Sequence, residues 1–193
     1  MRTSKELQTG KAGEYLVCAD LILKGFVAFL SEQGLPYDVL LDNGTKLLRI
    51  QVKTTSRTRR VQQRAVESKA YVFNVKRHGK GNIQRYGENE IDLFALVCLD
   101  TMKIGYLKTK DMPETINIRA DELRGTYYDE KGVLDYEKVL ALKGTMNNLE
   151  IAKVVGISNS TVGRMLKPEY KPFKTGARYF SDFIRERDWF NDL

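Results

Sequence analysis

The stretch PYDVLLDNGTKLLRIQVK, residues 36–53, decides the fold. It contains two largely apolar runs separated by Asn43-Gly44, which is the strongest short-range signal for a β-hairpin. If these two residues alone form the turn, Asp42 faces Thr45, and the other opposite pairs follow from that register. The stretch therefore predicts two antiparallel strands joined by a tight turn.

The two predicted strands have different faces, because successive side chains of a strand point to opposite sides. In this register Asp38 lies opposite Arg49. One face carries all the polar side chains together with two leucines: Asp38, Leu40, Leu47, Arg49, Gln51 and Lys53. The other face is apolar and is expected to join the core: Tyr37, Val39, Leu41, Leu48, Ile50 and Val52. A slip of one residue would exchange the two faces.

A helix is predicted before this hairpin, from about residue 4 to residue 24, ending at Gly25. Gly10 and Gly13 weaken the helix but leave room for the close approach of another backbone. Glu14 lies in the middle of the apolar stripe of the helix, where a carboxylate is out of place. Glu14 is therefore a candidate functional residue.

The rest of the pattern predicts an α/β (α+β) core followed by a small all-α domain. Further strands are expected at residues 26–30, 70–75, 92–99 and 103–108. The composition shifts to turn formers near residue 126, and helical patterns follow at residues 134–143, 148–155, 159–167 and within 176–193. We expect one domain at residues 1–126 and a second at residues 133–193.

The charge of the chain is concentrated in one region. The formal net charge is +7, and residues 49–86 alone carry eleven basic side chains against one acid. Such a basic surface indicates a polyanionic partner, which binds by phosphate neutralisation and counterion release. The basic side chains expected to contact DNA are Arg57, Arg59, Arg60, Arg64, Lys76, Arg77 and Lys80.

Composition also excludes several classes of protein. The single histidine, His78, lies in a basic run, so zinc sites and histidine-based hydrolysis are not expected. Cys18 and Cys98 lie in apolar runs and are expected to be reduced core residues. No apolar run is long enough to span a bilayer, and the N-terminus does not resemble a secretory signal. We expect an intracellular, cytoplasmic protein without a membrane partner.

The polar patch contains groups suited to a hard divalent cation, which prefers oxygen ligands. Oxygen atoms are offered by Glu14, Asp38, the Gln51 side chain and the backbone carbonyl of Val52. Lys53 adds a positive charge where a phosphate would lie. A metal polarises phosphate and activates water, and an ammonium group orients water or stabilises charge. The predicted chemistry is phosphodiester hydrolysis.

Three short motifs carry a resemblance to a known superfamily: Gly13-Glu14, Pro36-Tyr37-Asp38 and Gln51-Val52-Lys53. Over roughly residues 5–110 the chain resembles the PD-(D/E)xK nucleases, most of all the group I intron-type homing endonucleases and next the archaeal Holliday-junction resolvases. The resemblance implies a restriction-endonuclease-like mixed β-sheet core flanked by helices. It also implies Mg²⁺-dependent cleavage, with Mn²⁺ able to replace Mg²⁺, that leaves a 5′-phosphate.

The motifs depart from the superfamily pattern at two places. Tyr37 separates Pro36 from Asp38, and Gln51 stands where the family usually has a second acid. The site then holds only two carboxylates, Glu14 and Asp38, which should weaken metal binding and favour one ion over two. Homing endonucleases of this fold are known for glutamine at this place, so the substitution is compatible with activity.

Residues 148–167 match the helix-turn-helix pattern. Ala152 is the small residue expected where two helices cross, Gly156 is the turn glycine, and Ser158 can cap the second helix. The second helix would offer to a DNA major groove Ser158, Asn159, Ser160, Thr161, Arg164 and Lys167. The alternative interpretation is a small helical bundle that serves only for packing.

The leading hypothesis is a site-specific double-strand DNA endonuclease of homing type, from a prokaryote or phage. Because one active site cuts one strand, a homo-oligomer, either a dimer or a tetramer, is expected. One alternative is a Holliday-junction resolvase or repair nuclease of the same fold. The other is a non-catalytic helix-turn-helix DNA-binding regulator, for which Gln51 is the only support.

Overall fold

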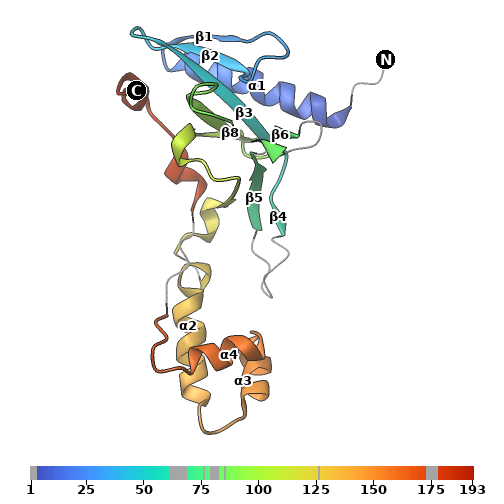
Figure 1. The fold of residues 1–193 in the computed structure, drawn as a ribbon, viewed down its shortest axis with the longest axis vertical. Helices are drawn as coiled ribbons and strands as arrows, with labels where there is room; N and C mark the ends of the chain where they lie inside the picture. The colour runs from blue at the N-terminus through green and yellow to red at the C-terminus, as the bar shows by residue number, and fades with distance from the viewer. Residues whose placement is uncertain are drawn as a thin grey trace. The chain divides into compact units, whose positions relative to one another are not determined.

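The computed structural model describes residues 4–60, 69–75, 77–78, 83–84, 86–125, 127–172 and 178–193. The chain divides into two compact units (Figure 1). The sheet unit comprises Met1–Arg59, Ala70–Arg119 and Arg178–Leu193. The helical unit comprises Arg60–Lys69 and Ala120–Ala177. Each unit has its own apolar core.

The sheet unit opens with the predicted helix and then alternates strands with short connections. Its main elements are α1 (Lys5–Leu23), β1 (Val27–Leu30), β2 (Val39–Asp42), β3 (Leu47–Thr55), β8 (Leu93–Cys98), β9 (Lys103–Lys108) and α5 (Arg187–Asn191). The shorter or peripheral elements are β4 (Arg59–Arg60), β5 (Lys69–Asn74), β6 (Arg77–His78), β7 (Ile83–Gln84), β10 (Thr115–Arg119), and the 3-10 turns η1 (Thr109–Asp111) and η3 (Phe180–Phe183). A further 3-10 turn, η2 (Asp121–Leu123), belongs to the helical unit.

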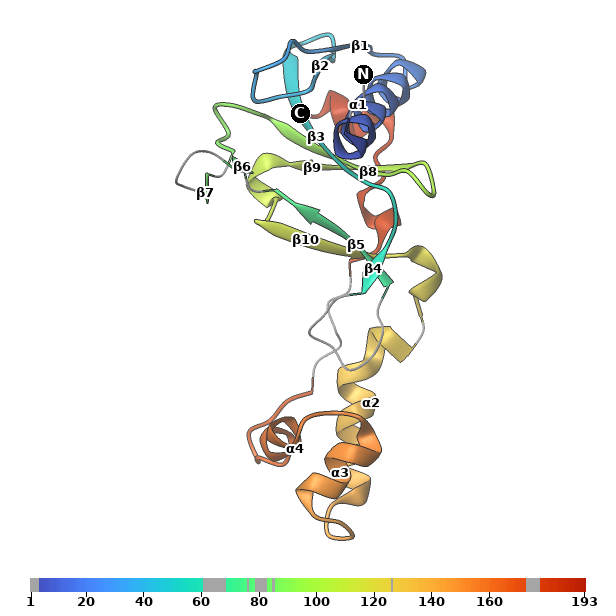
Figure 2. The same cartoon turned by 90° about the vertical axis from the view of Figure 1, so that its right-hand side faces the viewer.

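Five strands form the main sheet in the order β1-β2-β3-β8-β9. Strands β3 and β8 run parallel, and the other neighbours run antiparallel, so the sheet is mixed. Two smaller sheets have the orders β10-β5-β4 and β6-β7. Figure 2 shows α1 beside the main sheet. The mixed sheet with flanking helices confirms the expected restriction-endonuclease-like fold class.

The apolar face of the hairpin is the core face, as predicted. Its five residues from Val39 to Val52 are buried together with Val17 and Leu21 of α1. Burial of this face explains why the two strands tolerate no shift by a single residue, since such a shift would turn the apolar side chains into water. The hairpin thereby fixes the positions of the polar side chains on its other face.

The register of the hairpin differs from the predicted one by two residues. Asp42 pairs with Leu47 instead of Thr45, so the loop holds four residues. The reason lies in Asn43, whose side-chain oxygen accepts hydrogen bonds from the backbone N–H of Thr45 at 3.1 Å and of Lys46 at 3.0 Å. The side chain thus satisfies donors that a two-residue turn would have paired across the strands.

The shift has a useful consequence for the polar patch. An even shift leaves every side chain on its predicted face. Arg49 pairs with Leu40, and the same register continued by one residue sets Asp38 opposite Gln51 instead of Arg49. Asp38 is held there by its backbone N–H, which donates to the carbonyl of Ile50 at 2.9 Å.

The last segment of the chain belongs to the sheet unit, which corrects the expected second domain at residues 133–193. Phe190 is fully buried, with its ring centroid 5.6 Å from that of Phe26 and 4.9 Å from that of Tyr106. The amphipathic pattern of the segment is real, but it packs as the turn η3 and the short helix α5 on the sheet unit. The helical unit is therefore an insertion and not a terminal domain.

The two ends of this insertion meet on the sheet unit. The backbone N–H of Arg119 donates to the carbonyl of Arg178 at 2.8 Å, and Arg119 also forms a β-bridge with Tyr179. The chain thus leaves the sheet unit and returns to it at adjacent positions.

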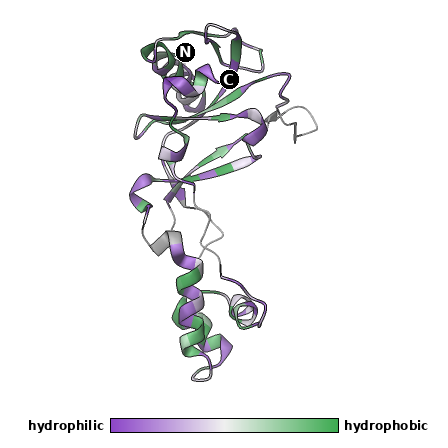
Figure 3. Cartoon of the chain, turned by 90° about the vertical axis from the view of Figure 1, so that its left-hand side faces the viewer, coloured by the Kyte–Doolittle hydropathy of each residue, from purple (hydrophilic) through white to green (hydrophobic). Residues whose placement is uncertain are grey.

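The helical unit contains α2 (Tyr127–Leu142), α3 (Asn148–Val155) and α4 (Asn159–Met165). In Figure 3, hydrophobic and hydrophilic residues alternate along α2. The core of the unit consists of Val139, Ile151, Ala152, Val162 and Met165. Helix α3 starts at a capping box formed by Asn147 and Glu150. In the part of the chain that the structure describes, no helix has the length and apolarity needed to cross a membrane.

Candidate active site

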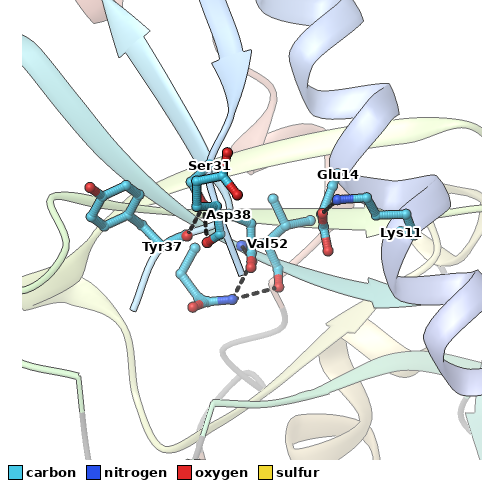
Figure 4. Close-up of polar contacts among 8 residues, drawn as sticks. Lys11, Glu14, Ser31, Tyr37, Asp38 and Val52 are labelled. Carbon is cyan, nitrogen blue, oxygen red and sulfur yellow. Dashed lines mark hydrogen bonds and ion pairs between the residues drawn. The ribbon is translucent and has the colours of Figure 1, made fainter. Parts of the chain in front are cut away.

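Asp38 directly precedes β2, and its carboxylate reaches across to β3. It accepts a hydrogen bond from the backbone N–H of Val52 at 2.8 Å and another from the side-chain amide of Gln51. Figure 4 shows Asp38 and Glu14 on either side of Val52. The hairpin register and the helix α1 thus bring together four of the predicted site residues from segments far apart in the sequence.

Gln51 is buried, with 7% of its surface exposed. Its side-chain nitrogen donates both to the Asp38 carboxylate and, at 3.3 Å, to the backbone carbonyl of Val52. The amide hydrogens therefore point at the Asp38 carboxylate and the Val52 carbonyl, two of the groups expected from the sequence to bind a metal ion. A positively polarised group already occupies the space between them.

Glu14 faces the same place from α1. Its carboxylate pairs with Lys11 at 2.8 Å, and 21% of its side chain is exposed. The close approach of α1 to β3 depends on Gly13, because a Cβ at this position would lie 1.9 Å from Thr54 Oγ1. The expected role of Gly13 is confirmed, whereas a Cβ on Gly10 would meet nothing within 4 Å, so the same expectation for Gly10 is wrong.

Lys53 points to the edge of the patch, where Tyr86 holds it. The Lys53 ammonium donates to the Tyr86 hydroxyl at 3.3 Å and lies 5.0 Å from the centre of its ring. The Tyr86 ring in turn packs edge-on against Phe94, with centroids 5.6 Å apart. This contact combines a hydrogen bond with a cation–π interaction and fixes the ammonium group.

Sequence reasoning missed Lys11 and Tyr86. Lys11 stands three residues before Glu14, a spacing that brings side chains together on a helix, so the sequence did contain a signal for it. Tyr86 lies between two strands and shows no periodicity that would relate it to Lys53. Only the folded chain brings these two residues together.

The two carboxylates and the two ammonium groups influence each other. Burial raises the pKa of the Asp38 carboxyl above its ordinary value; the Val52 N–H opposes this, and the charge of Glu14 adds to it. The pKa of Lys11 is raised as well, first by its hydrogen bond to Glu14. An added cation would relieve the repulsion between the two carboxylates.

The residues present fit a divalent cation with oxygen ligands. In the described residues no group of three or more His, Cys, Asp and Glu side chains could hold a metal ion. A set of oxygen donors at this place would combine Glu14 and Asp38 with the neutral oxygens of Gln51 and Val52. The Lys11 ammonium donates to Glu14, and the Gln51 amide donates to Asp38 and to the Val52 carbonyl, so positive or positively polarised groups already face these oxygens. The chemistry of the site therefore suits a divalent cation.

Arg49 lies on the polar face but serves another purpose. Its guanidinium binds the Asp92 carboxylate through Nε and Nη2, both at 3.0 Å, and its backbone N–H donates to the same carboxylate at 2.8 Å. Hydrogen bonds and charge from Arg49 hold the pKa of Asp92 below its ordinary value, against the effect of burial. The ion pair joins β3 to the start of β8 and is structural.

Two hollows flank the patch. The acidic hollow, of about 480 Å³, lies between α1 and the segment before β2 and reaches Glu14 and Asp38. The basic hollow, of about 300 Å³, lies between the first turns of α1 and the end of β3 and reaches Val52 and Lys53. Two separate hollows therefore give access to the residues of the patch.

The structure places only some of the basic side chains expected to contact DNA. Arg57 and Arg59 are exposed. Arg60 lies in β4 and Arg77 in β6, within strands whose backbone alone is described there. Three of the expected residues lie outside the described residues: Arg64, Lys76 and Lys80.

The residues of the predicted turn occupy the expected places in the helical unit. Gly156 ends α3 with a positive φ of 76°. The Ser158 hydroxyl caps α4 by accepting from the N–H of Thr161 at 3.1 Å, and it also bonds the hydroxyls of Ser160 and Thr161. Ser158 and Thr161 are thus committed to the cap. Exposed on α4 and just beyond it are Asn159, Ser160, Arg164 and Lys167.

Comparison with known proteins gives one family. A family model described as PD-(D/E)XK endonuclease matches residues 4–138. Among solved structures the chain is similar to the bacterial homing endonuclease I-Ssp6803I, with 16% sequence identity, 63% of this chain and 82% of that chain covered, and a TM-score of 0.49. No curated protein matches the chain.

Proposed function

Since the chain belongs to the PD-(D/E)XK endonuclease family, we propose that it cuts double-stranded DNA at specific sites with the help of a divalent metal ion. The observation that carries this proposal is the convergence of Glu14, Asp38, Gln51 and Val52 beside Lys53. Their chemistry is that of phosphodiester hydrolysis, and the hollows on both sides leave room for a DNA strand.

The metal ion, Mg²⁺ by proposal and replaceable by Mn²⁺, would be held by Glu14, Asp38, the Gln51 oxygen and the Val52 carbonyl. When bound, it supplies polarisation of the phosphate and an activated water. Holding it requires that Lys11 release Glu14 and that the Gln51 amide turn its oxygen towards the site, because both nitrogen groups now face the ligand oxygens.

Lys53 would stabilise the transition state. Water attacks the phosphorus, the bond to the 3′ oxygen breaks, and the 5′-phosphate stays on the other fragment. Negative charge grows on the non-bridging oxygens, and a fixed ammonium group beside them lowers its cost. Tyr86 keeps the Lys53 ammonium in place through the 3.3 Å contact.

The helical unit would supply site selectivity as a helix-turn-helix. The exposed Asn159, Ser160, Arg164 and Lys167 support this role, because they share α4 and the residues after it. Such side chains can read base edges in a major groove or bind phosphates. Cutting both strands would take two active sites, so we propose a dimer or tetramer.

A plasmid-cleavage assay in Mg²⁺ and in Mn²⁺ tests the proposal with the wild type, Asp38→Asn and Lys53→Ala. We expect the wild type to cut and both variants to lose at least about 100-fold in rate, the loss typical for removal of a charge-stabilising group. Calorimetry of metal binding should show weaker binding in Asp38→Asn. Selection from a random DNA library would then define the site.

The same assay decides between the alternatives. If the wild type and both variants are equally inert while DNA still binds, the chain is a non-catalytic regulator, as Gln51 in the place of an acid would favour. If four-way junctions are cut in preference to linear duplexes, the chain is a resolvase or repair nuclease.

A further inference from the structure

The basic hollow differs in charge from the acidic hollow. It is lined by three cationic residues, Lys5, Lys53 and Arg59, against one acid, Glu6, so its formal charge is +2. The hydroxyl-bearing residues Thr9 and Ser56 are also part of its wall. These are the groups with which proteins bind the phosphates of a DNA backbone.

The acidic hollow has the opposite balance. It contains three acids, Glu14, Glu32 and Asp38, against the single cation Lys11, so its formal charge is −2. A cation suits this hollow, and a phosphate does not. A DNA strand that lies across the patch therefore has a favourable place for a neighbouring phosphate on the side of the basic hollow only.

The charges of Lys5 and Arg59 are also available. Within the part of the chain that the structure describes, neither residue takes part in an ion pair, and both are exposed. Elsewhere in the same unit the cations Lys11, Lys24 and Arg49 are each paired with a carboxylate. Among the residues that the structure describes, Lys5 and Arg59 thus bring charge to the basic hollow that no ion pair neutralises.

We propose that the basic hollow binds the backbone phosphate next to the one that is cleaved, with Lys5 and Arg59 as its charged ligands. The proposal rests on the proposed function, because it takes Lys53 to mark the cleaved phosphate. A strand carries one phosphate per 3.4 Å of helix axis, so the adjacent phosphate lies within reach of a hollow that adjoins Lys53. This subsite carries no base information; it sets the register of the strand.

The test uses Lys5→Ala, Arg59→Ala and the double variant, with Lys46→Ala as a matched control. Lys46 is exposed in the hairpin loop. Because a strand rises about 3.3 Å per residue, Lys46 lies about 20 Å from Lys53 along β3. The substrate is a duplex that the wild type cuts, made in versions that carry one uncharged methylphosphonate linkage at each position around the cleaved bond. Single-turnover cleavage rates are measured for every pair of protein and duplex.

For the wild type we expect about a tenfold loss at one linkage directly beside the cleaved bond, the size of a charge-assisted hydrogen bond. The double variant should lose about tenfold on unmodified DNA and show no further loss at that linkage. Lys46→Ala should behave as the wild type does. A double variant that keeps the full sensitivity, or one as active as Lys46→Ala, overturns the proposal.

Affinity separates this inference from the proposed function. The logarithm of the binding constant falls with the logarithm of salt concentration by about 0.9 for each phosphate contact on duplex DNA. The double variant Lys5→Ala with Arg59→Ala should lower this slope by about that amount, because it removes both ligands of one phosphate, and Lys46→Ala should leave it unchanged. If no duplex is cut, the proposed function fails, and an unchanged slope in the double variant would then also rule out the basic hollow.

Discussion

The sheet unit and the helical unit obtain their functional surfaces in opposite ways. The site of the sheet unit joins Glu14, Asp38 and Lys53, which come from three elements and are separated by a wide stretch of sequence. The exposed surface of the helical unit comes from α4 and the few residues after it. One surface is assembled by long-range packing, and the other is a property of a local segment.

The difference has consequences for how each surface fails. A change in the packing between α1 and β3 should displace the proposed catalytic groups and leave the helical unit intact. A change of an exposed side chain on α4 should alter DNA selection and leave the chemistry intact. The following predictions test this separation, from the largest expected effect to the smallest.

Gly13→Ala should have the largest effect. The added methyl group would lie 1.9 Å from Thr54 Oγ1 and 3.0 Å from Thr54 Cβ, so helix or strand must move by about 1 Å. A misplacement of that size can lower a catalytic rate by about 100-fold. Overpacking should also lower the free energy of unfolding by about 1–3 kcal/mol. Cleavage kinetics and denaturant unfolding measure the two effects.

Gly10→Ala is the matched control, since its methyl group meets nothing within 4 Å. Replacing a glycine inside a helix by alanine should raise the free energy of unfolding by about 0.5–1 kcal/mol. The double variant of Gly13→Ala with Thr54→Ala should recover part of the loss, because Oγ1 and Cγ2 of Thr54 are gone and only its Cβ still lies close to the added methyl group. Equal behaviour of the two glycine variants would show that the contact between α1 and β3 does not position Glu14.

Arg164→Ala tests the other half of the comparison. Arg164 is exposed on α4, and if it contacts a base edge its removal should weaken binding to the selected site by about 1–3 kcal/mol. The rate of cleavage at saturating protein should stay the same, because the sheet unit is unchanged. Lys153→Ala on the exposed side of α3 removes the same charge and should affect neither. Competition binding against non-specific DNA provides the measurement.

The contrast also explains what the sequence could predict. The bounds of α3 and the turn at Gly156 follow from local capping and turn chemistry, and the sequence predicted them correctly. The alternation of strands with helices and the faces of the hairpin follow from periodicity, which is a local property too, whereas the restriction-endonuclease-like fold class was implied by the resemblance of three motifs. The exact register of the hairpin was wrong because the Asn43 side chain competes for backbone donors, and composition alone does not reveal that competition.

The non-local part of the site was beyond the sequence. Tyr86 contacts Lys53 only because the chain folds back, and no spacing relates the two residues. The last segment was misplaced for the same reason: its amphipathic pattern says that it packs, whereas the partners of Phe190 are set by the tertiary fold. A pattern predicts that a side chain is buried, but not against what.

Tyr86→Phe should produce a smaller effect than Arg164→Ala. The substitution keeps the ring beneath the Lys53 ammonium and removes the hydroxyl that accepts at 3.3 Å. Loss of one such hydrogen bond should lower the cleavage rate by about threefold to tenfold. Tyr86→Ala, which also removes the cation–π contact, should lower it further. An unchanged cleavage rate in Tyr86→Phe would contradict a positioning role.

The smallest predicted effect is on the free energy of unfolding, measured without divalent metal. Burial raises the pKa of Asp38 in the folded state, so the folded protein binds a proton more readily than the unfolded chain does. Below the unfolded pKa the carboxyl is protonated in both states and imposes no penalty. As the pH rises from the unfolded pKa through the folded pKa, the Asp38 carboxyl ionises more readily in the unfolded chain than in the folded protein. The free energy of unfolding therefore falls over this range.

Asp38→Asn removes this titration and keeps an oxygen that can accept from the N–H of Val52. Measured by denaturant unfolding without divalent metal, the variant should therefore gain stability relative to the wild type as the pH is raised from about 3 towards 7, starting below the ordinary pKa of Asp. The helical unit provides the internal control, because the substitution should leave the spectroscopic signal of α3 and α4 unchanged. A stability difference that is independent of pH would mean that the Asp38 carboxylate is compensated in the folded protein, and the site would then offer a metal ion less electrostatic attraction than its two carboxylates suggest.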